Sequence, residues 1–285
     1  MLSPLSPARA WLASAVVGVI CLAPGRQQPL CATETNAPKS STSSTAPHPL
    51  DEAMKLARAC VEEIKNNVDD YTAIIVKRER VNDKLGDTQY IFAKIRNRKT
   101  KGDKLETPFG VYMRFLKPAS VVGREVIWVE DQNDGMLVAH AAGILGLLTV
   151  HLKPEGTIAM MGQRYPITKI GLQMLVEDLI EKGEGQRKFG ECEVQFFKNS
   201  TIDKRTCTMI QVVHPQRREH FDFYRARIFI DDELNMPIRY AAWSWPETPG
   251  GEPVLLEEYT YLNLELNVGL KDSDFDPDNA EYHYP

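Results

Sequence analysis

About ten short runs of residues that favour β-strands, separated by turn sequences, dominate this 285-residue chain. In the run at 109–116, Val111, Met113 and Phe115 occupy every second position, which places their side chains on one face of a strand. Strands that are joined by tight turns must pair antiparallel, so the sequence predicts an antiparallel sheet. The runs cover residues 71–80, 88–96, 109–116, 125–130, 136–140, 192–198, 206–214, 223–230, 238–245 and 254–266.

Two further segments show the three-to-four spacing of apolar residues that is typical of amphipathic helices. The first covers 52–66 and follows Asp51, which we expect to be its N-cap. The second follows Thr168 as its expected N-cap and is expected to end at Gly183 and Gly185. Two helices against many strands indicate an α+β fold. We expect a curved antiparallel sheet, an open half-barrel, with two amphipathic helices covering its apolar concave face.

Residues 1–32 have the composition of an export signal, because Arg9 precedes an apolar stretch at 11–23 and small residues follow. That stretch is shorter than the about 20 apolar residues that span a bilayer, so we expect no transmembrane segment in the mature chain. Residues 33–48 are rich in Ser, Thr and Pro and predict a disordered linker. The remaining residues, 49–285, are expected to form one domain in the periplasm or cell envelope.

Charge and motifs narrow the classes of function. The chain has 34 basic and 39 acidic residues, a formal net charge of −5, and no long basic run, so we expect no nucleic-acid partner. Its six histidines are scattered, without a metal-binding spacing. Neither a Gly-x-Ser-x-Gly elbow nor a phosphate-binding glycine loop is present. The sequence therefore predicts a protein that is not an enzyme, with no catalytic residues, no metal and no cofactor.

Aspartates alternate near the C-terminus, in a pattern that resembles part of a calcium-binding loop. The pattern lacks the central glycine and the distal glutamate of an EF-hand, so we expect a solvated acidic tail instead. The aspartates are Asp272, Asp274, Asp276 and Asp278.

Two cysteines, Cys192 and Cys207, flank a turn that we expect around Asn199 and Ser200. If the flanking runs pair as a hairpin about this turn, the two cysteines fall nearly opposite each other, within the range of a disulfide. An oxidising compartment permits that bond. A disulfide and two buried thiols both remain open at this point.

Three segments resemble a family of exported bacterial proteins without an assigned activity, domain of unknown function family 1571. They are RYPITKIGL at 164–172, YTY at 259–261 and LKDSDFDPDNAEY at 270–282. The resemblance covers about residues 50–285 and implies no particular chemistry.

The chain is also distantly similar to the lipoprotein-carrier superfamily of LolA, LolB and the RseB sensor domain. The matching features are an amphipathic N-terminal helix and three short segments that follow it in the same order as in that superfamily. These segments are LKP at 116–118, VEDQNDG at 129–135 and IFIDDELNMP at 228–237. This resemblance implies a LolA-like fold, a curved antiparallel sheet with helices over an apolar concave face. LolA has an arginine where this chain has Lys117, so the resemblance does not extend to lipoprotein transfer by the LolA route.

The leading hypothesis is therefore an envelope protein that binds a lipid, an acyl chain or a lipoprotein in an apolar cavity. An apolar concave surface holds an acyl chain without any catalytic residue, because each buried methylene contributes about 0.8 kcal/mol. The candidate ligand-binding residues are Val111, Met113, Phe115, Val126 and Trp128 on strands, and Leu172, Leu175, Val176 and Leu179 on the second helix.

Two alternatives remain open. The same fold with a packed interior would serve as a protein-interaction or sensor module, which predicts an envelope protein as partner and no internal ligand. An enzyme whose site is assembled from residues distant in sequence is the least favoured alternative.

Overall fold

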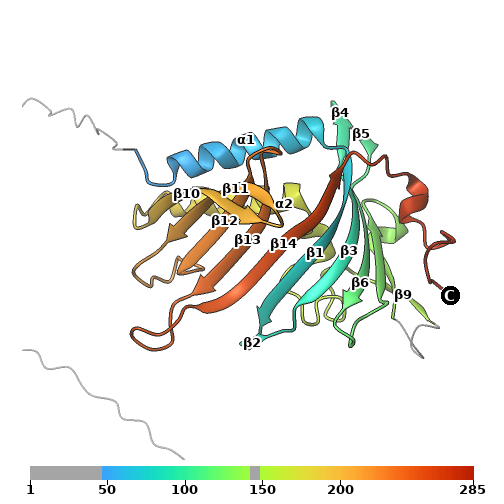
Figure 1. Cartoon of the computed structure of the whole chain (residues 1–285). Coiled ribbons are helices and arrows are strands. Elements are labelled where there is room, and N and C mark those ends of the chain that lie inside the picture. The colour runs from blue at the N-terminus through green and yellow to red at the C-terminus, as the bar shows by residue number, and fades with distance from the viewer. Residues whose placement is uncertain (1–46, 142–147) are drawn as a thin grey trace, which may run out of the picture. The chain divides into compact units, whose positions relative to one another are not determined.

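The computed structural model describes residues 47–141 and 148–285 (Figure 1). The expected export signal at 1–32, and the expected linker up to residue 46, lie outside these described residues.

The described residues build a large antiparallel sheet whose strands follow the order β10-β11-β12-β13-β14-β1-β3-β6-β7-β8-β9, with β2 paired to β1. A separate hairpin consists of β4 and β5. Since β9 and β10 lie at opposite edges, the sheet is not closed into a barrel, which confirms the predicted open, curved antiparallel sheet. The strands are β1 (Asp70–Val81), β2 (Lys84–Leu85), β3 (Gln89–Arg96), β4 (Lys99–Lys101), β5 (Lys104–Thr107), β6 (Gly110–Lys117), β7 (Glu125–Val129), β8 (Leu137–His140), β9 (Thr149–Leu152), β10 (Glu193–Ile202), β11 (Arg205–Val213), β12 (Arg225–Asp231), β13 (Met236–Ser244) and β14 (Val254–Leu266).

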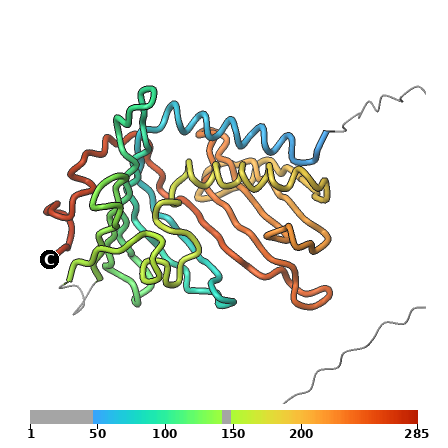
Figure 2. The backbone as a smooth tube through the Cα atoms, turned by 180° about the vertical axis from the view of Figure 1, so that it is seen from behind, coloured from blue at the N-terminus to red at the C-terminus, as the bar shows by residue number. Residues whose placement is uncertain are grey.

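Two α-helices, α1 (Asp51–Asn67) and α2 (Leu172–Gln186), pack against each other and cover one face of the sheet (Figures 1 and 2). We call this the inner face. The predicted first helix is confirmed within one residue at each end. Its N-cap is Leu50, however, and Asp51 instead accepts a hydrogen bond of 2.9 Å from the backbone N–H of His48. The described part of the chain also contains three short 3-10 helices: η1 (Asn133–Gly135), η3 (Ile167–Lys169) and η4 (Asp272–Phe275).

The second helix differs from its prediction at both ends. Thr168 lies in η3, and the N-cap of α2 is Gly171, whose φ of 113° suits only glycine. The helix also continues through Gly183 and Gly185. A Cβ atom at Gly183 would lie 2.3 Å from the sulfur of Met54 on α1. This glycine therefore permits the close approach of the two helices and does not end the second one.

The topology explains why the inner face is covered. The chain leaves the sheet at one edge, on β9, and re-enters it at the other edge, on β10. The connection, which we call the crossover segment (residues 153–192), must therefore pass across the sheet, and it contains η3 and α2. Figure 2 shows it passing over the strands.

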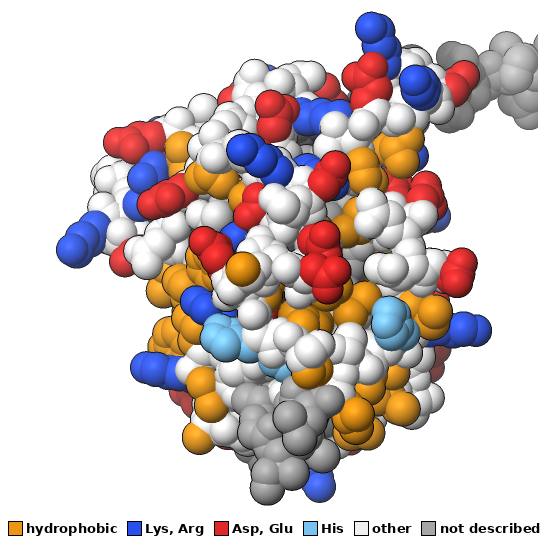
Figure 3. All heavy atoms as spheres, turned by 90° about the vertical axis from the view of Figure 1, so that its right-hand side faces the viewer, with side chains coloured by type: hydrophobic (Ala, Val, Ile, Leu, Met, Phe, Trp, Pro, Cys, Tyr) orange, Lys and Arg blue, Asp and Glu red, His pale blue; other side chains and the backbone are white. Residues whose placement is uncertain are grey.

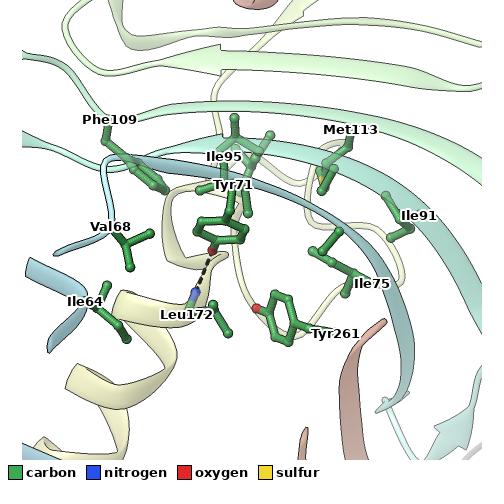
Figure 4. Packing of buried hydrophobic residues seen from close by; sticks show 14 of the residues in the cluster. Ile64, Val68, Tyr71, Ile75, Ile91, Ile95, Phe109, Met113, Leu172 and Tyr261 are labelled. Atoms are coloured by element: carbon green, nitrogen blue, oxygen red, sulfur yellow. Dashed lines mark hydrogen bonds between the residues drawn. The ribbon is translucent and has the colours of Figure 1, made fainter. Parts of the chain in front are cut away.

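A continuous hydrophobic core joins the sheet to this cover (Figure 4). Ile64 of α1, Tyr71 of β1 and Leu172 of α2 are all fully buried. The backbone N–H of Leu172 donates a hydrogen bond of 2.8 Å to the hydroxyl oxygen of Tyr71. This bond satisfies one of the free N–H groups at the start of α2 and fixes the helix to the sheet.

The C-terminal residues cover the opposite, outer face of β6 and β7, which corrects the expectation of a solvated tail. Phe275 is buried, and Tyr282 stacks on Tyr112 with 4.0 Å between the ring centroids. Asp272 and Asp274 accept hydrogen bonds of 2.6 Å from Arg96 and Lys94, respectively. The expectation failed because Phe275, between two of the aspartates, and Tyr282, after the last of them, pack on the sheet.

Of the two alternatives left open for Cys192 and Cys207, the structure excludes the disulfide, since both cysteines are free. The hairpin turns at Asp203 and the next residue, which both have positive φ, and Cys207 lies opposite Ser200. The expected turn at Asn199 is instead a β-bulge inside β10. Cys192 precedes that strand, so the two thiols lie far apart along the hairpin.

Candidate ligand cavity

A cavity of about 440 Å³ lies between the inner face of the sheet and the crossover segment. Its volume falls within the range of about 300–1,000 Å³ that is typical of small-molecule sites. The cavity has an apolar part on the strands from β1 to β9 and a polar part near β13, β14 and β1.

The apolar part consists of two adjacent rows of side chains that run across neighbouring strands, and we call them together the apolar wall. Ile75 lies opposite Ile91, which in turn lies opposite Phe115. In the adjacent row, Val126 lies between Met113 and Ala139. From β1 to β8 the wall crosses four interstrand steps, a length of roughly 19 Å. All of its members line the cavity, so the wall offers an extended apolar surface to a ligand. The wall consists of Ile75, Ile91, Met113, Phe115, Val126 and Ala139.

The polar part is built around two buried glutamates, Glu79 and Glu257, which lie directly opposite each other on β1 and β14. Glu257 accepts hydrogen bonds from Arg164 Nε at 2.7 Å and from the hydroxyls of Tyr165 and Tyr240 at 3.2 and 3.3 Å. Like charges in directly opposed positions destabilise a sheet unless other groups compensate them. The arginine and the hydroxyls provide that compensation for Glu257.

Glu79 has a matching set of donors. Lys77 lies 3.2 Å from its Oε2 atom, and the backbone N–H of Arg164 donates to the same oxygen at 3.1 Å. The hydroxyl of Tyr259 donates to Oε1. Since Arg164 contacts both glutamates, the crossover segment is bound to the sheet at this point. We call these groups together the polar network.

The tyrosines of this network are hydrogen-bond donors and not nucleophiles. Burial raises the pKa of Tyr165, and the charge of Glu257 raises it further. Burial and the same carboxylate raise the pKa of Tyr240 well above its ordinary value. Burial and Glu79 act in the same direction on the pKa of Tyr259. The three hydroxyls therefore stay neutral at physiological pH.

Two of the segments that carry the family resemblance meet at the cavity. From the first, Arg164 and Tyr165 enter the polar network, while Ile167 is buried in the core. From the second, Tyr259 enters the network and Tyr261 lines the cavity wall. The two segments thus build one structural unit, the junction between the crossover segment and the centre of the sheet.

The structure separates the nine candidate ligand-binding residues into groups. Val111 and Leu172 are fully buried in the core. Val176 lines a second, smaller cavity of about 70 Å³. Trp128 packs on Phe109, with ring centroids 5.9 Å apart, and donates from its indole N–H to a backbone carbonyl. The other five line the main cavity, and ligand binding by them stays a prediction: Met113, Phe115, Val126, Leu175 and Leu179.

Sequence reasoning missed the polar network. The pattern that would have revealed it is a charged residue at an inward-facing position of an alternating strand, where burial requires a partner. Glu79 follows Tyr71 and Ile75 at even spacing on β1, and Glu257 precedes Tyr259 and Tyr261 on β14. Their partners on the crossover segment are distant in sequence, so spacing alone does not identify them.

The described residues contain no group of three or more His, Cys, Asp or Glu side chains arranged to hold a metal ion. Within 47–141 and 148–285, no helix has both the length and the apolar character needed to cross a membrane.

The fold and site thus define an open antiparallel half-barrel with a roofed apolar cavity. The chain belongs to the family described as Protein of unknown function (DUF1571), which matches residues 68–284. No curated protein matches the sequence.

Several solved structures are distantly similar. MucB aligns with a TM-score of 0.45 and 12% identity, over 79% of this chain and 62% of MucB. The Mycobacterium tuberculosis lipoprotein LppX aligns with a TM-score of 0.42 and 13% identity, over 79% of this chain and all of LppX (100%). A LolA superfamily protein from Nitrosomonas europaea aligns with a TM-score of 0.31 and 11% identity, over 81% of this chain and 98% of that protein.

Proposed function

We propose that this protein is an exported envelope protein that binds an acyl chain, as part of a lipid or a lipoprotein, without catalysing a reaction. The observation that carries the proposal is the 440 Å³ cavity with its apolar wall. The composition of residues 1–32 supports export, and we propose that residues 49–285 act as one domain behind a linker at 33–48. Neutral tyrosines and fully partnered glutamates support a role in binding and not in catalysis.

The energetics of such binding are simple. Each methylene that enters the cavity contributes about 0.8 kcal/mol, which corresponds to about a fourfold gain in affinity. This gain must first offset the cost of association, about 4 kcal/mol or more. Short chains should therefore bind weakly, and affinity should rise with chain length until the chain fills the wall.

The test is a calorimetric titration of delipidated protein with fatty acids of increasing length. We expect about a fourfold increase in affinity per methylene over part of the series. Ala139→Phe places a ring into the cavity and should weaken binding by at least about tenfold, because it removes space for several methylenes. Ala119→Phe is the matched control, since Ala119 is exposed and does not line the cavity. Binding that is absent or independent of chain length would contradict the proposal.

An envelope protein as a partner is a second candidate role, and one observation favours it. Ile158 and Met161 of the crossover segment are 67% and 73% exposed, yet both also line the cavity. Hydrophobic side chains gather on the lower half of the face seen in Figure 3, below a half that is rich in charges. A partner that bound at Ile158 and Met161 would contact the cavity directly, as transfer of a ligand requires.

A further inference from the structure

The polar and apolar parts of the cavity extend to opposite sides of β1, which itself carries Ile75 of the wall and Glu79 of the network. The apolar wall lies on β1, β3, β6, β7 and β8, whereas Tyr240 and Glu257 of the polar network lie on β13 and β14. A ligand that satisfies both parts must itself be apolar along most of its length and polar at one end. This arrangement favours an amphiphile over a plain hydrocarbon.

One cation at the polar part has no ion-pair partner among the described residues. Among the cations there, Arg164 pairs with Glu257 at 2.7 Å, and Lys77 pairs with Glu79 at 3.2 Å. Lys182 of α2 also lines the cavity, but no carboxylate of the described residues lies within 4.0 Å of its ammonium group. Lys182 is therefore the cation of the polar part without a close ion pair among the described residues, and Glu257 and Asp222 act on it only from beyond 4.0 Å.

The ammonium group of Lys182 does not use all of its N–H donors within the described residues. Its one hydrogen bond to the described residues is a long one, 3.4 Å to the hydroxyl oxygen of Tyr165. A lysine has three N–H donors, so two of them remain for a ligand. Burial lowers the pKa of Lys182, but Tyr165 and Glu257 outweigh this effect and hold the pKa above its ordinary value. The group is thus charged at neutral pH.

We propose that the ligand is an anionic amphiphile, whose carboxylate or phosphate head binds Lys182 while its chain lies along the apolar wall. This inference rests on the proposed function and adds the chemical class of the ligand. A head at Lys182, beside β13 and β14, leaves the chain directed toward β6, β7 and β8, where the lining is apolar. A bond between a charged donor and a charged acceptor is stronger than its neutral equivalent, so the head adds selectivity as well as affinity.

One other cation lines the cavity without a carboxylate partner among the described residues. Arg124 lies over the ring of Phe115, 5.6 Å from the ring centroid, at the apolar end. Among the described residues, no hydroxyl accepts a hydrogen bond from its guanidinium group. Arg124 is therefore the competing position for an anionic head, and the experiment distinguishes it from Lys182.

The experiment compares dodecanoate, dodecyl phosphate and dodecan-1-ol, which share one chain and differ in the head, at pH 7.5 by calorimetric titration. The wild-type protein should bind at least one anion about tenfold or more tightly than the alcohol. The tighter of the two anions identifies a carboxylate or a phosphate as the head. Lys182→Met keeps the apolar stem and should reduce this preference to within about twofold without weakening the alcohol.

Lys188→Met is the matched control, because Lys188 is exposed and does not line the cavity, and it should keep the full preference. A preference that persists in Lys182→Met, or that is lost in Arg124→Met, would overturn the proposed head position. Equal binding of alcohol and anions by the wild-type protein would overturn the anionic ligand but leave the proposed function intact. If neither the alcohol nor the anions bind, the proposed function itself fails.

Discussion

At the scale of single residues, the polar network is the least ordinary feature of this protein. Two carboxylates lie opposite each other on the buried face of a sheet, where an unpaired charge is very costly. Glu257 is tolerated because Arg164 and two tyrosines complete its hydrogen bonds. The same arginine belongs to the crossover segment, so the network that neutralises the sheet also holds the cavity's roof in place.

Loss of Arg164 should therefore destabilise the fold. We expect Arg164→Met to lower the free energy of unfolding by about 2 kcal/mol, because it leaves Glu257 buried without its cation. The effect should be smaller than for a fully buried pair, since the Arg164 side chain is 31% exposed. Adding Glu257→Gln to this variant should recover at least half of the loss. Urea unfolding followed by circular dichroism measures both effects.

The comparison variant is Lys169→Met, which breaks an ion pair with Asp178 on the same crossover segment. Lys169 is 47% exposed, so its loss should cost less than about 0.5 kcal/mol. Equal losses for Arg164→Met and Lys169→Met would show that the polar network does not hold the crossover segment.

At the scale of elements, sequence patterns predicted whether a segment is a helix or a strand more accurately than its ends and its pairing partners. The alternation of Met113 and Phe115 predicted a strand with an inward apolar face, and the structure places both residues on the cavity. Turn residues were less informative, because Asn199 adopts positive φ in a bulge as readily as in a turn. That ambiguity shifted the expected hairpin register and placed Cys192 opposite Cys207, although the structure pairs Cys207 with Ser200.

The role of the glycines near the end of α2 was ambiguous in a similar way. A glycine ends a helix when it adopts positive φ, but it also allows a second helix to approach closely, and sequence alone does not separate the two roles. The structure assigns the second role to Gly183, which faces Met54 of α1, whereas Gly185 faces open space.

This assignment predicts opposite effects for two neighbouring substitutions. Gly183→Ala should destabilise the protein by about 1–2 kcal/mol, because the new methyl group overpacks the contact with Met54. Gly185→Ala should stabilise it by about 0.5–1 kcal/mol, since alanine favours a helix and nothing lies within 4 Å of the new atom. Thermal unfolding of the two variants tests this difference. Stabilisation by both substitutions would contradict the close helix approach.

At the scale of the whole molecule, the cavity follows from the strand order. The first strand, β1, pairs with the last, β14, in the middle of the sheet, which leaves β9 and β10 at the two edges. The crossover segment between those edges must pass over the inner face, and its packing determines how much space remains beneath it. Strand order is not encoded in any local sequence pattern. The sequence therefore predicted an apolar cavity on the inner face, but neither its position beneath the crossover segment nor its polar end.

The C-terminal residues show the same limit. The aspartates alone favoured a solvated tail, but Phe275 and Tyr282 dock on the outer face of β6 and β7. Both faces of these strands are therefore covered. The C-terminal residues cover the outer face, and the crossover segment covers the inner face, with the cavity between it and the strands.

The most direct test of the cavity as a lipid site is native mass spectrometry of the protein purified from its own envelope. We expect the folded protein to carry one additional mass, that of an acyl-containing lipid, which organic extraction removes. The Ala139→Phe variant, prepared in the same way, should be free of it because its cavity is filled. A wild-type protein that carries no bound lipid, or an Ala139→Phe variant that carries the same lipid, would contradict this account.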